Sequence, residues 1–199
     1  MSKQTFNPGL WKPRSVAETL DIYADWATSY DADVTEAGYV TPARVARALA
    51  AHLPDRGTQV LDYGCGTGLS GAALAAEGFA QIDGTDISTE MLGVAGTKGI
   101  YTTLWQSAPG EAPGTYPAIV ATGVVSLGAA PPETLGMLLG CLAPGGLLAL
   151  SYNDATLADP AYLDAMAAAG SVAELLFEEY GPHLPAKEMG AKVYVLRRR

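Results

Sequence analysis

The chain has 199 residues, of which 49% are hydrophobic and 17% charged. These proportions allow one α/β domain with a substantial core and exclude a disordered chain. The formal net charge is −9, and no Lys or Arg lies between Arg56 and Lys98 or between Lys98 and Lys187. Because nucleic-acid binding needs a basic surface, we exclude nucleic acid as a partner.

Targeting, membrane and metal signals are all missing from the sequence. It holds no run of 18 apolar residues and no signal-peptide core, so we expect a cytoplasmic protein that does not contact a membrane. Cys65 and Cys141 are the only cysteines, and His52 and His183 lie far apart in the chain. The sequence therefore predicts neither a disulfide framework nor a metal site.

The first 40 residues are predicted to form an arm and a helix that precede the main domain, residues 41–199. Proline and glycine within residues 1–14 indicate an extended arm. Ser15 begins a capping-box pattern, and the apolar spacing after it predicts a helix that runs to about Asp33.

Strand and helix patterns alternate along the rest of the chain. This alternation indicates an α/β fold, namely a doubly wound, Rossmann-like, mostly parallel seven-stranded sheet with helices on both faces. The ligand is expected at the carboxyl ends of the strands, near the point where the strand order reverses. The expected strands are 59–62, 81–86, 101–105, 116–122, 147–152, 174–180 and 192–197, and the expected helices are 41–53, 68–77, 89–95, 132–142 and 159–169.

The strongest chemical signal is a glycine-rich turn between the first of these strands and the helix after it. The segment reads VLDYGCGTG, and Gly64, Gly66 and Gly68 have the spacing G-x-G-x-G rather than the G-x-G-x-x-G of dinucleotide enzymes. Glycines permit positive φ and let a ligand approach the backbone, although such a turn also occurs for structural reasons alone.

Two acidic residues strengthen the interpretation of this turn as a ligand site. Asp62 ends the first strand, and Asp86 ends the second. An acidic residue about 20 residues past such a turn meets ribose hydroxyls, and a carboxylate accepts two hydroxyl hydrogen bonds well. The alternative role of Asp86 is to cap the helix that follows, which Ser88 could do instead.

These residues carry a family resemblance. VLDYGCGTG, GTDIS with Met91 after it, and LAPGGLLALSYN resemble the motifs of class I S-adenosylmethionine-dependent methyltransferases over residues 40–155. A narrower match covers most of the chain. YADWATSYDADV, AGYVTPARVARAL and EGFAQIDGTDISTEML resemble the methyltransferase-like proteins of the Williams–Beuren syndrome region and their bacterial relatives.

The resemblance implies S-adenosylmethionine as cofactor, S-adenosylhomocysteine as product and a role for each matching residue. The glycine turn would lie along the cofactor, with Asp62 behind its amino group and Asp86 on its ribose. The amino-terminal helix would form a lid, although aromatic residues at helical spacing also occur as core. The residues implied to contact the cofactor are Tyr23, Trp26, Tyr30, Asp62, Gly64, Cys65, Gly66, Gly68, Asp86, Ile87, Met91, Ser107, Ala108, Thr122 and Gly123.

Two features of the sequence bear on specificity. Ser107 stands where many members of the family have an Asp for the adenine amino group, so adenine recognition is expected to rest on Ser107 or on backbone groups. Six acids crowd the amino-terminal segment, either as a solvated helix face or to attract a cationic acceptor to the site. They are Glu18, Asp21, Asp25, Asp31, Asp33 and Glu36.

The expected activity is methyl transfer to a small molecule, with a protein acceptor as the second choice. The fourth strand ends in ATGVV rather than in the Asp/Asn-Pro-Pro-Tyr/Phe motif of nucleic-acid amino methylases. No catalytic residue is assigned, because the sulfonium is intrinsically reactive and the protein mainly positions the acceptor. Two alternatives stay open, a non-catalytic module that binds the cofactor and a nicotinamide-dependent oxidoreductase.

Overall fold

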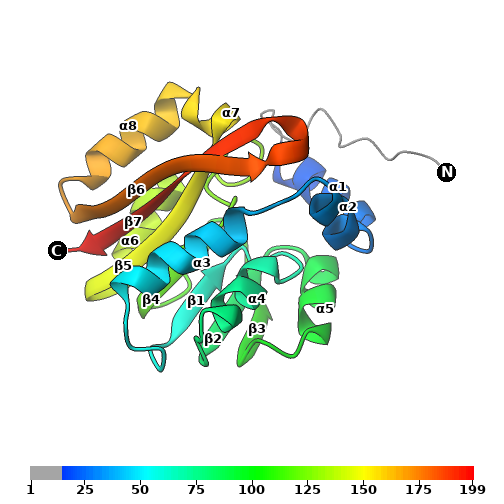
Figure 1. Ribbon diagram of the computed structural model, residues 1–199, viewed down its shortest axis with the longest axis horizontal. Helices are drawn as coiled ribbons and strands as arrows, with labels where there is room; N and C mark the ends of the chain where they lie inside the picture. Colours follow the sequence, from blue (N-terminus) through cyan, green and yellow to red (C-terminus); the bar gives the residue numbers. More distant parts are fainter. Residues whose placement is uncertain (1–14) are drawn as a thin grey trace.

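The computed structural model describes residues 15–199, and its centre is a seven-stranded sheet with the order β3-β2-β1-β4-β5-β7-β6 (Figure 1). All neighbouring pairs are parallel except those that involve β7, which runs antiparallel to both of its neighbours. The predicted doubly wound, mostly parallel sheet is therefore confirmed. The strands are β1 (Val60–Tyr63), β2 (Ile82–Asp86), β3 (Thr103–Gln106), β4 (Tyr116–Ala121), β5 (Leu142–Asn153), β6 (Ala173–Leu184) and β7 (Met189–Arg198).

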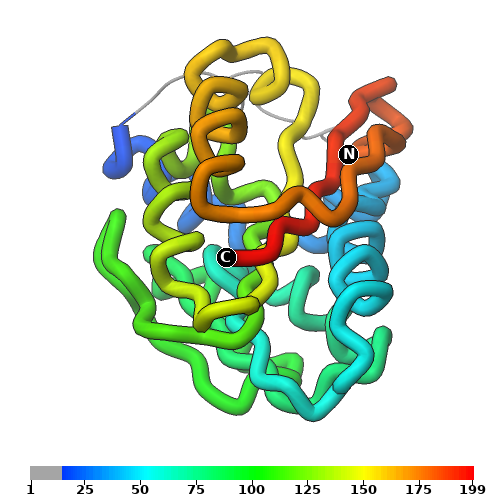
Figure 2. The backbone as a smooth tube through the Cα atoms, turned by 90° about the vertical axis from the view of Figure 1, so that its left-hand side faces the viewer, coloured from blue at the N-terminus to red at the C-terminus, as the bar shows by residue number. Residues whose placement is uncertain are grey.

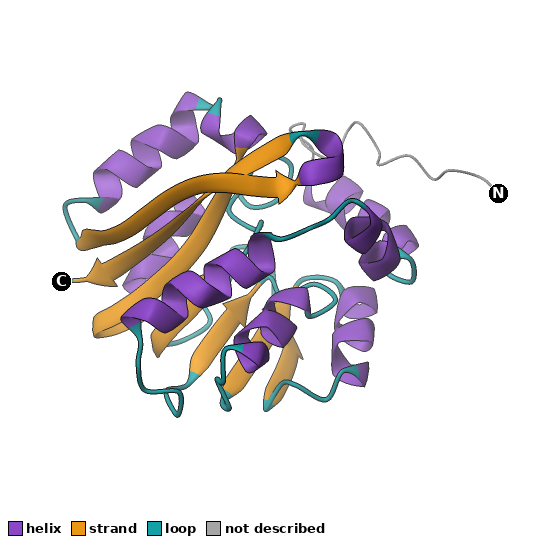
Figure 3. Ribbon diagram, in the orientation of Figure 1, coloured by secondary structure: helices purple, strands orange, loops and turns teal. Residues whose placement is uncertain are grey.

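Helices cover both faces of this sheet (Figure 3). The helices of the main domain are α3 (Thr41–His52), α4 (Leu69–Ala76), α5 (Thr89–Thr97), α6 (Glu133–Gly140), α7 (Asp154–Leu157) and α8 (Pro160–Ala169). Figure 2 shows α3 on one side of the strands and α6 and α8 on the other. Each face has its own apolar core, one around Leu49 and Leu74 and the other around Leu135 and Leu138. Burial of these side chains is the main force that holds the layers together.

The strand order reverses between β1 and β4, because β2 pairs with β1 on one side and β4 pairs with it on the other. The glycine turn leaves β1 and the segment Thr122–Val124 leaves β4, so both lie at this reversal. Ligands of doubly wound sheets bind at this edge, outside the carboxyl ends of the strands. The fold therefore puts the predicted motif where a ligand site is expected.

The amino-terminal helix expected to run to Asp33 is two helices instead, α1 (Val16–Trp26) and α2 (Tyr30–Glu36). Ser15 caps α1 with the predicted capping box. The break is held by side chains that converge on one carboxylate, since Trp26 Nε1 and Ser29 Oγ donate to Asp33 Oδ2 at 2.6 and 3.0 Å. Such local bonds compete with helical continuation. The predicted arm, residues 1–14, lies outside the described residues.

The last two strands are longer than the sequence pattern indicated. β6 and β7 form an antiparallel hairpin that the short 3₁₀ helix η1 (Pro185–Lys187) joins. The extension carries the end of β6 past the sheet to the amino terminus of α3, where the backbone N–H of Val40 donates to the carbonyl oxygen of His183 at 3.2 Å. This contact brings His183 to the carboxyl edge. Among residues 15–199, no helix has the length and apolarity needed to cross a membrane.

Candidate functional site

A cavity of about 370 Å³, here called the main cavity, opens at the carboxyl edge of the sheet. That volume falls within the range of small-molecule sites. Its walls come from α1, the turn after β1, the ends of β2 and β3, and the loops after β3 and β4. The lining residues are Val16, Thr19, Tyr23, Tyr30, Tyr63, Gly64, Gly66, Asp86, Ile87, Met91, Ser107, Pro109, Gly110, Thr122, Gly123, Val124, Ala129, Ala130, Pro131 and Thr134.

The three glycines of the turn differ in what surrounds them, although all have positive φ. A Cβ on Gly66 would meet nothing within 4 Å, whereas a Cβ on Gly64 would lie 2.4 Å from a methyl group of Val124. A Cβ on Gly68 would meet the ring of Tyr101 at 3.1 Å. Gly66 therefore exposes bare backbone to the main cavity. Gly64 and Gly68 are needed for close packing as well as for their backbone conformation.

Asp62 is wholly buried beneath the turn, and only one of its carboxylate oxygens has partners. Oδ2 accepts hydrogen bonds from Ser70 Oγ at 2.6 Å and from Tyr101 Oη at 2.7 Å. Oδ1 has no partner among the described residues. Burial raises the pKa of Asp62 to about 6. The hydrogen bonds from Ser70 and Tyr101 lower the pKa and so limit this rise. An unsatisfied buried carboxylate oxygen is costly, so this atom is a strong acceptor for a ligand or for water.

Asp86 lines the main cavity and holds the glycine turn in shape. Its Oδ2 accepts from the backbone N–H of Gly66 at 2.8 Å, and its Oδ1 accepts from the backbone N–H of Ser88 at 2.9 Å. Burial raises the pKa of Asp86 above its ordinary value. Each carboxylate oxygen can accept a second hydrogen bond, so both remain available to hydroxyl groups of a ligand. The Ser88 hydroxyl caps α5, as the sequence suggested.

The ends of β3 and β4 supply the other polar groups of the main cavity. Ser107 is buried, and its backbone N–H donates to the carbonyl oxygen of Asp86 at 3.1 Å. The Thr122 hydroxyl is buried and has no partner among the described residues, which makes it the second orphaned polar group at this edge. Gly123 has a φ of +71° and donates its backbone N–H to Ser151 Oγ at 3.1 Å.

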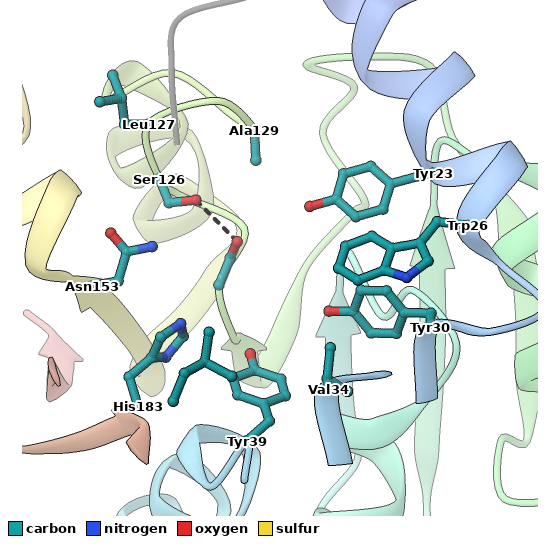
Figure 4. Close-up of a pocket in the computed structure, with 12 residues that line it drawn as sticks. Tyr23, Trp26, Tyr30, Val34, Tyr39, Ser126, Leu127, Ala129, Asn153 and His183 are labelled. Carbon is teal, nitrogen blue, oxygen red and sulfur yellow. Dashed lines mark hydrogen bonds between the residues drawn. The ribbon is translucent and has the colours of Figure 1, made fainter. Parts of the chain in front are cut away.

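A second, smaller cavity of about 70 Å³ adjoins the main cavity and is here called the side pocket (Figure 4). Tyr23, Tyr30, Gly123 and Ala129 line both spaces. Trp26, which the sequence placed at the cofactor, lines the side pocket and lies between Tyr23 and Tyr30, with ring centroids 6.3 and 4.7 Å away. The residues that line the side pocket are Tyr23, Trp26, Tyr30, Val34, Tyr39, Gly123, Ser126, Leu127, Ala129, Asn153, His183 and Leu184.

Apart from Trp26, which lines only the side pocket, the predicted site residues divide into two groups. Those that line the main cavity are Tyr23, Tyr30, Gly64, Gly66, Asp86, Ile87, Met91, Ser107, Thr122 and Gly123. Asp62, Cys65, Gly68 and Ala108 lie outside that lining, behind or beside the turn and the loop after β3. Burial raises the pKa of the Cys65 thiol, so this cysteine stays protonated and is a poor nucleophile.

Sequence reasoning missed several lining residues. Val16 and Thr19 share a helix face with Tyr23, and the helical spacing of these three positions was the available signal. Pro109 and Gly110 lie in an irregular loop, and residues 129–131 lie in the loop before α6, so neither group has a periodic signal. His183 and Asn153 in the side pocket lie more than 25 residues from the nearest predicted site residue.

Comparisons with known proteins agree with this architecture. A family described as a methyltransferase domain matches residues 35–191. Human methyltransferase-like protein 27 is 36% identical over 143 residues, which cover 68% of this chain and 58% of the human protein. A ubiquinone biosynthesis O-methyltransferase of Burkholderia lata is 31% identical over 134 residues, or 63% of this chain and 56% of that protein. The chain thus spans less than two thirds of the length of these relatives.

A solved structure shares the fold. The magnesium protoporphyrin IX methyltransferase of Synechocystis, solved with bound S-adenosylmethionine, superposes with a TM-score of 0.65 and 18% identity. The match covers 94% of this chain and 100% of that one. The sheet order, the reversed β7 and the glycine turn after β1 together define the class I methyltransferase architecture. The chain belongs to the methyltransferase domain family, which confirms the resemblance found in its sequence.

Proposed function

We propose that this protein binds S-adenosylmethionine in the main cavity and transfers its methyl group to a small molecule. The charge of the cavity wall carries the proposal. Asp86 is the only charged residue that lines it among residues 15–199, and no Lys or Arg does. A nicotinamide dinucleotide brings a pyrophosphate that needs positive partners, whereas S-adenosylmethionine has no phosphate and carries a positive sulfonium. We therefore favour the methyl donor over a nicotinamide cofactor.

Four parts of the cavity wall fit the donor. Bare backbone at Gly66 permits the close approach that a larger residue would block. The Thr122 hydroxyl lines the cavity, is buried without a partner among the described residues and can donate to the carboxylate of the donor, while Asp62 lies behind the turn, outside the lining. Asp86 retains acceptor capacity on both oxygens for the ribose hydroxyls. Ile87 and Met91 provide the apolar surface for the adenine, and Ser107 lies at its edge.

The protein aligns the reactants and excludes water from the site, and we assign no residue as a general acid or base. When bound, S-adenosylmethionine would supply an electrophilic methyl group for transfer from its sulfur to the acceptor. The aromatic side chains of α1 and α2 cover the space between the main cavity and the side pocket, where they exclude water and align the acceptor. We propose this pair of helices as the lid.

A small-molecule acceptor is supported by two observations. The side pocket beside the main cavity is small, and the relatives from Burkholderia are named for ubiquinone biosynthesis. A protein acceptor stays the second choice. Asp31 and Asp33 bond within the protein, so they are poorly placed to recruit a cationic acceptor.

Calorimetric titration of the protein with S-adenosylhomocysteine and, separately, with NADH tests the cofactor. We expect S-adenosylhomocysteine to bind and NADH not to, and we expect Asp86→Leu to weaken S-adenosylhomocysteine binding at least tenfold. Glu90→Leu, at an exposed site on α5, is the matched control. NADH binding without S-adenosylhomocysteine binding would refute the proposal. Persistent absence of transfer from tritiated donor across an acceptor screen, despite tight binding, would favour a non-catalytic module.

A further inference from the structure

The side pocket has an uncharged wall. None of its 12 lining residues is Asp, Glu, Lys or Arg. Figure 4 shows the rings of Tyr23, Trp26 and Tyr30 along one side and Asn153 and His183 on the opposite side. A charged group in this space would lose its hydration without gaining a counter-charge, which is unfavourable. The wall therefore suits a neutral ligand with a planar apolar face.

Asn153 presents its amide N–H groups to the pocket. Its Oδ1 accepts hydrogen bonds from the backbone N–H and the hydroxyl of Thr156, each at 3.0 Å. A backbone N–H can only donate, so the Asn153 atom that the Thr156 N–H contacts is the side-chain oxygen. The side-chain nitrogen of Asn153 is therefore at the other end of the amide. Figure 4 shows the nitrogen end directed toward the pocket. Among the described residues, no acceptor bonds to this nitrogen.

His183 presents a second donor to the pocket. Its ring is buried, with 6% exposed, and its Nδ1 lies 2.8 Å from the hydroxyl oxygen of Thr41. Thr41 is wholly buried, and its hydroxyl has no other partner among residues 15–199. If the Thr41 hydroxyl donates to Nδ1, its hydrogen has an acceptor, and the ring proton is then on Nε2. The opposite arrangement would leave the hydroxyl hydrogen without an acceptor, which is unfavourable.

The ring of His183 is neutral at pH 7, because burial lowers its pKa to about 4. Asp154 raises this pKa and Arg44 lowers it further, so the two charged neighbours oppose each other. The Tyr39 ring packs edge-on against His183 with centroids 5.2 Å apart, and this contact holds the imidazole in place. The pocket thus combines two fixed N–H donors with an aromatic wall.

From this arrangement we infer that the side pocket is the acceptor subsite and takes a neutral aromatic ring that carries an oxygen substituent. Asn153 and His183 donate to this oxygen, and the opposite edge of the ring faces the main cavity past the shared residues Tyr23, Tyr30 and Gly123. A volume of about 70 Å³ holds about five water molecules, which is room for a single ring. The inference rests on the proposed function, because it presumes that the methyl donor occupies the main cavity.

Small aromatic probes test the inference in protein saturated with S-adenosylhomocysteine. We expect 4-methoxyphenol, which is neutral and carries oxygen, to bind at least tenfold more tightly than benzylamine or benzoate, which are charged. Ligand-observed NMR measures such weak affinities. If the protein binds S-adenosylhomocysteine but prefers benzylamine or benzoate, or does not distinguish the probes, the subsite inference is wrong while the proposed function stands. If S-adenosylhomocysteine does not bind, both fail.

Asn153→Asp is the sharpest variant. Aspartate caps a helix as well as asparagine does, so α7 keeps its first-turn bond, while a carboxylate oxygen replaces the N–H groups. We expect at least tenfold weaker binding of 4-methoxyphenol and tighter binding of benzylamine, with the affinity for S-adenosylhomocysteine unchanged. Unchanged selectivity between these two probes would overturn the role of Asn153 and with it the inference.

His183→Phe keeps a ring against Tyr39 and removes the donor. We expect it to weaken 4-methoxyphenol binding at least fivefold, and we expect His52→Phe, the matched control at the chain's other histidine, to leave the affinity unchanged. The imidazole ¹⁵N spectrum of the unliganded wild-type protein checks the assignment directly, since it holds two histidines. A neutral Nε2–H tautomer for His183 at pH 6 supports the donor, and an Nδ1–H tautomer or a protonated ring overturns it.

Discussion

Lys98 bonds to Asp31 and so links α5 to α2. Lys98 Nζ, at the end of α5, lies 2.6 Å from Asp31 Oδ2 on α2, and it also donates to the carbonyl oxygen of Thr67 at 2.6 Å. The Thr67 hydroxyl donates to Asp31 Oδ1 at 2.5 Å, so α2, the glycine turn and α5 are joined at one point. Lys98 is the only cation between Arg56 and Lys187 in the sequence. This contact ties the proposed lid to the glycine turn.

Lys98→Met is expected to loosen α2 and weaken S-adenosylhomocysteine binding about fivefold. The methionine keeps an apolar side chain of similar length but loses both hydrogen bonds. Partly exposed ion pairs contribute about 1 kcal/mol or less, and the bond to Thr67 adds a comparable amount. Titration calorimetry at low and moderate salt measures the effect, which should shrink with added salt. Lys192→Met removes the ion pair with Glu178, neither of which lines the main cavity, and should leave binding unchanged. Equal effects of the two variants would contradict the tie.

Gly66→Ala is expected mainly to weaken ligand binding, whereas Gly64→Ala is expected mainly to lower the stability of the fold. The left-handed conformation costs alanine about 1–2 kcal/mol at either position. At Gly66 the added methyl enters the main cavity without a protein contact, so binding of S-adenosylhomocysteine should fall at least tenfold with a modest loss of stability. At Gly64 the methyl collides with Val124, which adds about 1–3 kcal/mol of destabilisation. Chemical denaturation and calorimetry separate the two effects. Equal stability of the two variants would contradict this assignment.

Asp62 should make unliganded protein less stable as the pH rises from 4 to 7. Its folded pKa of about 6 lies above the ordinary 3.8. Its contribution is therefore fully present below pH 3.8 and is lost as the pH passes through 6. The change amounts to about 3 kcal/mol at most. Denaturation at several pH values measures it as the difference between wild type and Asp62→Asn, which does not titrate. A difference that stays constant with pH would rule out the raised pKa.

His183 should act on stability in the opposite direction. Its pKa falls from 6.5 to about 4 on folding, chiefly because the ring is buried. Its contribution is present above pH 6.5 and is lost as the pH falls toward 4, by about 3 kcal/mol at most. We define the difference as the unfolding free energy of wild type minus that of the variant. On acidification this difference should fall for His183→Phe and rise for Asp62→Asn. Parallel slopes for the two variants would show that one assignment is wrong.

Local patterns were enough to predict most of the sheet and the glycine turn. Gly64, Gly66 and Asp86 follow from a strand end, a turn and a spacing, all of which depend on neighbours in the sequence. The break after Trp26 was not predicted, because side chains that meet across the turn at Asp33 hold it rather than a helix-breaking residue. Propensity carries no signal for such a contact.

The sequence by itself determined the family, the seven-stranded sheet and the place of the glycine turn, because periodicity and short motifs record local interactions. Only the tertiary structure decided that Gly66 faces the main cavity while Gly64 and Gly68 pack against Val124 and Tyr101. It also brought His183 to Thr41, 142 positions earlier in the chain, and so built the side pocket beside the main cavity. Contacts of that range depend on how the β6–β7 hairpin packs on α3, and no local pattern encodes that packing.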